Sequence, residues 1–150
     1  MWVDDNLEFA DATSVGTPNN STVNVGDFLN KGTVRDIGNG EPVYLVIQVT
    51  TAIISGGAAT VAFLLVSDAT TTIEVNGTAT KHAETKAFPV ADLIAGFQVV
   101  IPLPPEEPDW EQYVGVQVKE TASQALTGGN INAFLTLNPA VHKSYADAVN

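Results

Sequence analysis

The chain has 150 residues, of which 45% are hydrophobic and 15% are charged. This composition describes one globular domain, large enough to bury roughly 70% of the surface that its unfolded form would expose. Seventeen acidic side chains against six basic ones give a formal net charge of −11. Such a surface repels phosphate backbones, so we expect no direct binding of nucleic acid.

Compartment is indicated mainly by absent signals. The chain contains no cysteine, so the usual mark of an oxidising compartment is missing. No apolar run approaches the ~20 residues that cross a bilayer, and the first residues lack the pattern of a signal peptide. We therefore expect synthesis in the cytoplasm and no association with a membrane.

Residues 1–20 are predicted to form a flexible N-terminal arm. The segment is polar and contains a clear turn at Gly16–Ser21. It also contains apolar residues at positions 7, 9 and 15, a spacing that fits either a loose edge strand or an arm lying on a partner. An acidic arm of this kind cannot bury enough surface by itself to offset its ordering entropy. We expect it to order against neighbouring subunits through large anchors such as Trp2, Leu7 and Phe9.

Residues 21–138 are predicted to form the domain itself. Short strands are expected at 22–25 and 33–37, on either side of a loop at 27–31. Two apolar runs follow, Val43–Thr50 and Ala59–Val66, joined through Ser55-Gly56-Gly57. Their β-branched residues and the glycine pair predict two paired strands at the centre of a sheet.

The remaining elements are also short. We expect a strand at 70–75, a hairpin turn at Asn76-Gly77, and a short helical turn or loop at Phe88–Gly96. Alternating apolar residues predict further strands at 97–103, 113–119 and 130–138. Residues 139–150 are predicted to be a C-terminal tail.

This pattern predicts an all-β fold. About eight short strands are separated by turns, and no amphipathic helix is long enough to cover a sheet. A single-domain, antiparallel two-sheet sandwich of the jelly-roll type fits best. Alternation along the two apolar runs predicts two core rows, which are Val43, Leu45, Ile47 and Val49, and Ala59, Val61, Phe63 and Leu65. Val46, Leu64 and Val66 lie on the opposite faces. We expect them to form an apolar patch that favours a homo-oligomer, a trimer or a dimer.

Few residues are suited to catalysis. His82 and His142 are the only histidines, both in polar sequence, and we expect them to be surface residues. The acidic group Glu106, Glu107, Asp109 and Glu111 lacks the spacing of a calcium loop and is expected to be a solvated loop. We predict no enzymatic activity, no metal and no cofactor. Trp110 is expected at the edge of the core, although an exposed tryptophan could instead stack on a sugar.

Several segments together resemble a known family. They are Arg35–Val49, Gly57–Phe63, Pro89–Phe97, Tyr113–Val118 and Leu126–Leu135. These stretches are similar to the capsid cement, or decoration, proteins of tailed bacteriophages of the Bordetella-phage type. The similarity extends over about residues 7–138.

The resemblance implies a virion structural protein on the outer surface of an icosahedral capsid. Such proteins assemble as oligomers and clamp neighbouring major capsid proteins of the HK97-like fold against internal DNA pressure. The expected capsid or subunit contacts are Trp2, Asp4, Asp5, Leu7, Phe9 and Trp110. A carbohydrate-binding β-sandwich is the alternative, because exposed aromatic residues on a sandwich can bind sugars.

Overall fold

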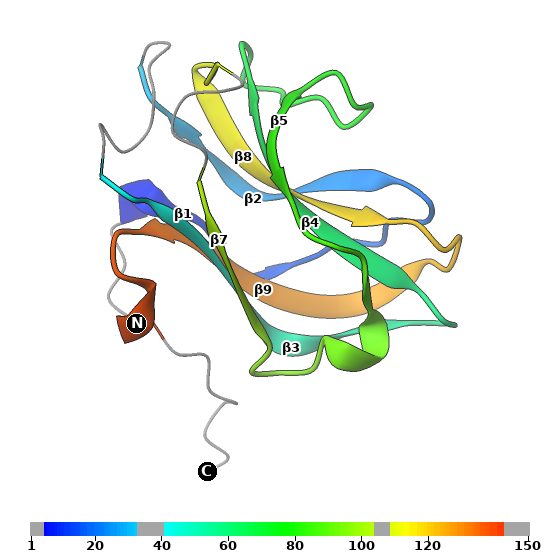
Figure 1. The fold of residues 1–150 in the computed structure, drawn as a ribbon. Coiled ribbons are helices and arrows are strands. Elements are labelled where there is room, and N and C mark those ends of the chain that lie inside the picture. The colour runs from blue at the N-terminus through cyan, green and yellow to red at the C-terminus, as the bar shows by residue number, and fades with distance from the viewer. Residues whose placement is uncertain (1–4, 33–40, 104–108, 143–150) are drawn as a thin grey trace.

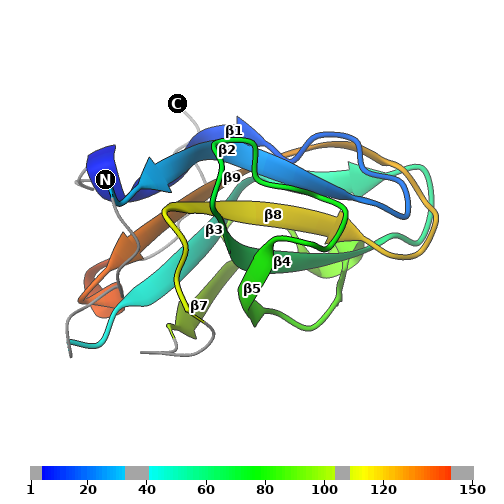
Figure 2. The same ribbon diagram turned by 90° about the horizontal axis from the view of Figure 1, so that it is seen from above.

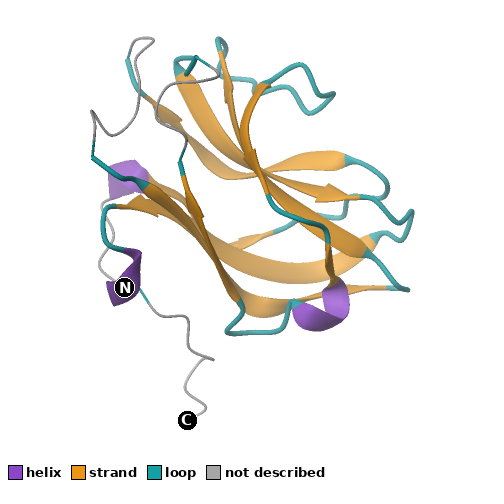
Figure 3. Ribbon diagram, in the orientation of Figure 1, coloured by secondary structure: helices purple, strands orange, loops and turns teal. Residues whose placement is uncertain are grey.

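The fold is built almost entirely from strands (Figures 1 and 3). The computed structural model describes residues 5–32, 41–103 and 109–142. In these ranges the strands are β1 (Glu8–Ser14), β2 (Thr22–Asn30), β3 (Tyr44–Ser55), β4 (Thr60–Asp68), β5 (Thr80–Glu84), β6 (Phe88–Pro89), β7 (Gln98–Pro102), β8 (Tyr113–Glu120) and β9 (Leu126–Thr136). The short 3₁₀ helices are η1 (Asp5–Leu7), η2 (Val90–Asp92) and η3 (Pro139–Val141). No described helix is long and apolar enough to span a membrane.

The strands form two antiparallel sheets that pack face to face. One sheet has the order β1-β9-β3-β7 and the other the order β2-β8-β4-β5, with β6 pairing to β4. Thus β1 pairs with β9, β2 with β8, β3 with β7 and β4 with β5, and successive pairs alternate between the sheets. This arrangement is that of a jelly roll, and the predicted fold class is confirmed.

The core lies between the two sheets. Leu45, Ile47 and Val49 point inward from β3, and Val61, Phe63 and Leu65 point inward from β4. All six are fully buried. The period of two in these strands therefore predicted the inward-facing rows correctly.

The predicted central hairpin is wrong in its pairing. β3 and β4 lie in different sheets, where β3 pairs with β9 and β7 and β4 pairs with β8, β5 and β6. Both runs are apolar on both faces, as the prediction noted, but the connection at 56–59 carries the chain from one sheet to the other. An apolar run indicates that a strand lies at the centre of a sheet, but it does not indicate which strands are its neighbours.

Part of the predicted N-terminal arm belongs to the sandwich instead. Residues 8–14 form β1, which is hydrogen-bonded along β9, and Phe9, Ala10 and Val15 are buried in the core. The edge-strand alternative therefore holds for this segment, and it does not need a neighbouring subunit to become ordered. Apolar burial against the sandwich supplies the stabilisation that its polar composition seemed to lack.

Two further predictions fail on local detail. Residues 27–30, expected in a loop, continue β2 beyond a bulge between Val25 and Leu29. Residues 70–75, expected as a strand, form a loop in which the Asp68 carboxylate accepts hydrogen bonds from the backbone N–H groups of Thr70 and Glu74. Hydrogen bonding to such a side chain competes with a strand ladder. The strand expected at 33–37 lies outside the described residues.

The chain itself buries the central apolar side chains on the outer faces of both sheets. Ile73, from the loop before β5, packs with Ala62, Leu64 and Val66 on one outer face. On the other sheet, Val46 and Phe134 are fully buried and the His142 ring lies 4.8 Å from that of Phe134. The predicted exposed patch of Val46, Leu64 and Val66 is therefore wrong, because these side chains are at most 8% exposed.

Gly26 brings the edge strands of the two sheets into direct contact. Its φ is +70°, and a Cβ at this position would lie 1.9 Å from the carbonyl oxygen of Phe9 in β1. Figure 2 shows β1 and β2 side by side at this edge of the sandwich. Only glycine combines this left-handed conformation with so close an approach of two backbones.

Glu120, at the end of β8, joins three connections at one end of the sandwich. It is 1% exposed, and its carboxylate accepts hydrogen bonds from the N–H groups of Asn20 (2.7 Å) and Ala122 (2.6 Å). Burial opposes its negative charge, but backbone hydrogen bonds from Asn20, Ala122, Gln124 and Thr60 outweigh burial and lower the pKa of Glu120. Glu120 is thus a structural carboxylate.

Gly26→Ala is expected to destabilise the fold strongly, by at least about 2 kcal/mol in the free energy of unfolding, because the added methyl group forces β1 and β2 apart. Gly32→Ala is the matched control, since Gly32 also has a positive φ (+74°) but open space around it. It should cost only about 1 kcal/mol of backbone strain. Urea unfolding measures both; equal losses would contradict the close approach at Gly26.

Glu120→Gln should lower the free energy of unfolding at pH 7 by about 2 kcal/mol, because a neutral amide replaces a charged acceptor of buried N–H groups. The pKa of Glu120 is lowered in the folded protein, so the contribution of its charge is complete above the usual value of 4.5 and is lost as the pH falls below it. Glu84→Gln removes a solvent-exposed pair with Lys81 and should cost less than about 1 kcal/mol. Urea unfolding at pH 7 and pH 3.5 tests both, and an equal small loss would refute the role of Glu120.

Candidate interaction site

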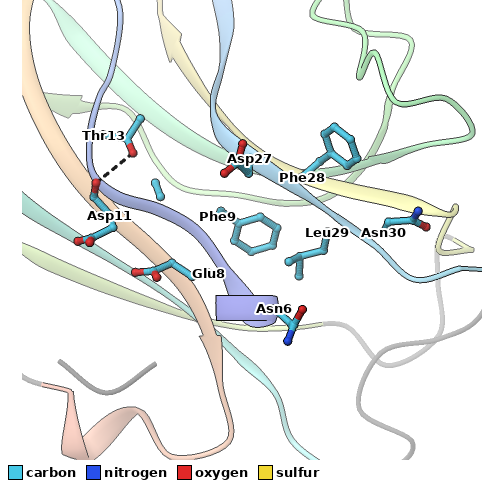
Figure 4. A pocket seen from close by; sticks show the side chains of 10 residues that line it. Asn6, Glu8, Phe9, Asp11, Thr13, Asp27, Phe28, Leu29 and Asn30 are labelled. Atoms are coloured by element: carbon cyan, nitrogen blue, oxygen red, sulfur yellow. Dashed lines mark hydrogen bonds between the residues drawn. The ribbon is translucent and has the colours of Figure 1, made fainter. Parts of the chain in front are cut away.

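A groove lies where the two sheets end, between the edge strands β1 and β2. Its volume is about 480 Å³. Figure 4 shows Phe9 and Leu29 between the two strands, with Glu8 and Asp11 on β1 and Asp27 on β2. The lining residues are Asn6, Glu8, Phe9, Ala10, Asp11, Thr13, Asp27, Phe28, Leu29 and Asn30.

Irregularities in both strands shape this groove. The register of β1 against β9 shifts between Glu8 and Ala10 and again between Ala10 and Thr13. At the second shift Ala12 has a φ of +44°, and its N–H donates to the Asn132 side chain at 2.7 Å. The bulge in β2 leaves Asp27 and Phe28 exposed, and the Phe28 ring packs edge-to-face on Tyr113 at 5.4 Å. Bulges turn side chains away from their regular positions, and here they direct acidic groups into the groove.

The groove is negatively charged. Glu8, Asp11 and Asp27 contribute three carboxylates, and the described lining residues include no lysine, arginine or histidine. Phe9 forms the buried base at 2% exposure, and Phe28, 42% exposed, adds apolar surface. Acidic and apolar surface therefore lie together along one edge of the molecule.

The structure places the predicted contact residues unevenly. Leu7, 41% exposed, lies in η1 immediately before β1, and Asp5 begins η1. Phe9 is in the core, so its predicted role as an anchor on a partner is wrong. Trp2 and Asp4 lie outside the described residues. Asp27, which the sequence placed in a loop, was missed; the only signal was the alternation of Val23, Val25 and, after Gly26, Leu29.

Trp110 is not a contact residue either, because it is 1% exposed. Its ring stacks on that of His82 at 3.6 Å, with an interplanar angle of 7°. The core-edge expectation for Trp110 is the one that the structure supports. Its burial also removes it as a platform for a sugar.

His82 is half-buried and structural rather than a free surface group. Its Nε2 lies 2.7 Å from the Ser67 hydroxyl, and Ser67 in turn accepts a hydrogen bond from the Glu111 N–H at 3.0 Å. A serine beside a histidine is the pair that nucleophilic catalysis requires. Ser67, however, is completely buried, so a substrate has no access to its hydroxyl.

The remaining acidic candidates are dispersed. Glu106 and Glu107 lie outside the described residues, Asp109 is exposed, and the Glu111 carboxylate accepts a hydrogen bond from Thr80 Oγ1 at 2.6 Å. Within the described ranges, no group of three or more histidine, cysteine or acidic residues is placed to hold a metal ion.

Comparison with known proteins identifies the family. The model of the Bbp16 family matches residues 9–135, which is most of the chain and the whole of the sandwich apart from the ends of β1 and β9. The chain belongs to the Bbp16 family. The family name indicates a Bordetella phage protein, which agrees with the phage relationship inferred from sequence. No curated protein matches the chain.

His82 should make the stability depend on pH. Burial, and secondarily the positive charge of Lys31, lower the pKa of His82 from 6.5 to about 4. Between these two pH values the unfolded chain protonates His82 while the folded protein keeps it neutral. Above pH 6.5 this does not reduce the stability of the fold, and as the pH falls towards 4 stability is progressively lost. The loss should be on the order of 2–3 kcal/mol.

His82→Gln removes this titration while retaining a side chain that can hydrogen-bond Ser67. The variant should be less stable at pH 7, because the stack on Trp110 is lost, but its stability should fall less between pH 7 and pH 4.5. Urea unfolding at several pH values measures the slope. Both proteins keep Glu120, so the difference between their slopes of stability against pH measures the contribution of His82. Equal slopes would contradict the lowered pKa of His82.

Proposed function

We propose that this protein is a structural component of a phage particle, a cement or decoration protein on the outer surface of an icosahedral capsid. Its partner would be the major capsid protein, of HK97-like fold, and its role to clamp adjacent subunits of the DNA-filled shell. It would be made in the host cytoplasm and would have no enzymatic activity and no cofactor.

The observation that carries this proposal is the match to a phage-related family over residues 9–135. The fold supports it, because jelly rolls are frequent in viral capsid proteins. The side chains that might have supported catalysis serve packing instead: Ser67 is buried and His82 is stacked on Trp110. This packing supports a domain that acts through its shape and surface.

The carbohydrate-binding alternative loses support. Sugar-binding sandwiches present exposed aromatic rings, and Trp110, the tryptophan within the domain, is buried. Phe28 and Tyr113 pack edge-to-face, at 85°, and so do not form a flat platform for a sugar ring.

Self-association into a trimer or dimer is also part of the proposal. It rests on the resemblance to cement proteins alone. The apolar patch of Val46, Leu64 and Val66 no longer supports it, because these side chains are buried by the chain's own segments. Light scattering of the purified protein at tens of micromolar tests it. A monomer would remove self-association in solution from the proposal.

The test of the capsid role is reconstitution on particles. The major capsid protein encoded in the same genome should form shells that lack the cement protein. Added purified protein should bind the outer surface of these shells, once expanded, and raise the temperature at which they dissociate. Cryo-electron microscopy locates the added density. Density inside the shell, or no binding to expanded shells, would overturn the proposed function.

A further inference from the structure

We propose that the groove between β1 and β2 binds an extended, basic segment of another protein, which lies lengthwise along the two strand edges. The proposal builds on the proposed function in one respect: the partner would be a shell protein. The groove, its charge and its strand edges are features of this chain alone.

The first argument is the state of the two strands. β1 pairs only with β9, and β2 only with β8, so each has one edge without a strand neighbour in the described parts of the chain. A strand edge presents backbone N–H and C=O groups to any extended segment that approaches it. Peptides commonly bind proteins by adding to such an edge. Here two edges face the same groove.

The second argument concerns the chemical character of the lining. Sites for small molecules are lined mainly by apolar side chains with a few polar groups. This groove instead combines three carboxylates with Phe9, Phe28 and Leu29. An extended segment alternates its side chains between two sides. A segment that alternates lysine or arginine with apolar residues therefore complements the acidic and apolar parts of the lining.

The third argument excludes other occupants. A second copy that paired groove to groove would bring six carboxylates together, because Glu8, Asp11 and Asp27 would face their equivalents. The chain has only six basic residues and a net charge of −11. Residues 143–150 contain one lysine and one aspartate, so they offer no net positive charge. The occupant is therefore a basic segment from a different protein.

Acidic residues on strand edges also have a simpler use. Charges and bulges at an edge prevent unwanted pairing between sheets, and this edge has both. The two interpretations differ in what they predict for a basic strand. A purely protective edge repels every added strand, whereas a binding groove accepts a basic one and rejects an acidic one.

The test uses a labelled eight-residue peptide that alternates lysine and valine, with a peptide that alternates glutamate and valine as the control. Fluorescence anisotropy should show binding of the lysine peptide to the full-length protein, weakened by added salt, and no binding of the glutamate peptide. Backbone amide NMR shifts should concentrate in residues 8–14 and 27–30. No binding, or shifts centred on another face, would overturn the proposal.

A pair of matched substitutions separates the groove from the general charge of the protein. Asp27→Lys and Asp92→Lys each change the net charge by the same amount at an exposed position, but only Asp27 lines the groove. Asp27→Lys should weaken the binding of the lysine peptide roughly tenfold, whereas Asp92→Lys should weaken it by no more than about twofold. Unchanged melting temperatures confirm that both variants fold. Equal weakening by the two would overturn the proposal.

The outcome is independent of the capsid test. If the lysine peptide binds in the groove but the protein does not attach to shells, the proposed function fails and the basic-segment site stands. If the protein attaches to shells but neither peptide binds, the basic-segment site fails and the capsid role stands.

Discussion

The structure depends on one constraint, which is that the first half of the chain pairs with the second half in reverse order. β4 and β5 close the ribbon, and the pairs β3·β7, β2·β8 and β1·β9 follow outward along it. Successive pairs alternate between two sheets, so each pair buries one face against the next. The hydrophobic core is the consequence of this alternation. Most of its contacts therefore join residues far apart in the sequence, and the core forms only when the whole ribbon has folded.

The same constraint explains why the candidate site lies at the β1/β2 edge. The ribbon ends there, so neither strand has an outer strand neighbour in the described parts of the chain, and the space between the sheets would be open to water. Gly26, against the Phe9 carbonyl, closes it by bringing the two backbones together. Register shifts in both strands lie beside this contact, and acidic side chains from both strands line a common groove next to it. The closure of the core and the groove thus lie at the same edge of the sandwich.

The sequence alone predicted the sandwich, most of its long strands and their inward rows, because alternation along one strand is a local property. It did not predict that β3 and β4 lie in different sheets, since apolar runs such as Val43–Thr50 carry no information about partners. The groove was missed for a similar reason. Leu7 and Asp5 were predicted as capsid or subunit contacts and lie in η1, just before β1. Asp27 belongs to the groove only because β2 is brought beside β1 in space. Trp110 was expected both at the edge of the core and as a contact residue, and only the first expectation holds. Its stacking on His82, 28 positions away, is a contact that the local sequence does not indicate.

The covering of the two outer faces has a consequence for how this domain meets a partner. Sandwich proteins that associate through a sheet face must leave apolar side chains exposed there, and a broad apolar patch marks such an interface. Here Ile73 covers one face and the segment around His142 packs on Phe134 on the other. Because the central apolar side chains of both faces are already buried, we expect contact at strand edges, at loops and at the polar parts of the faces. An edge supplies backbone hydrogen bonds in a fixed direction, so a partner held there is aligned as well as bound. Acidic side chains along that edge add selection by charge, which favours a basic partner and opposes contact between two copies of this edge.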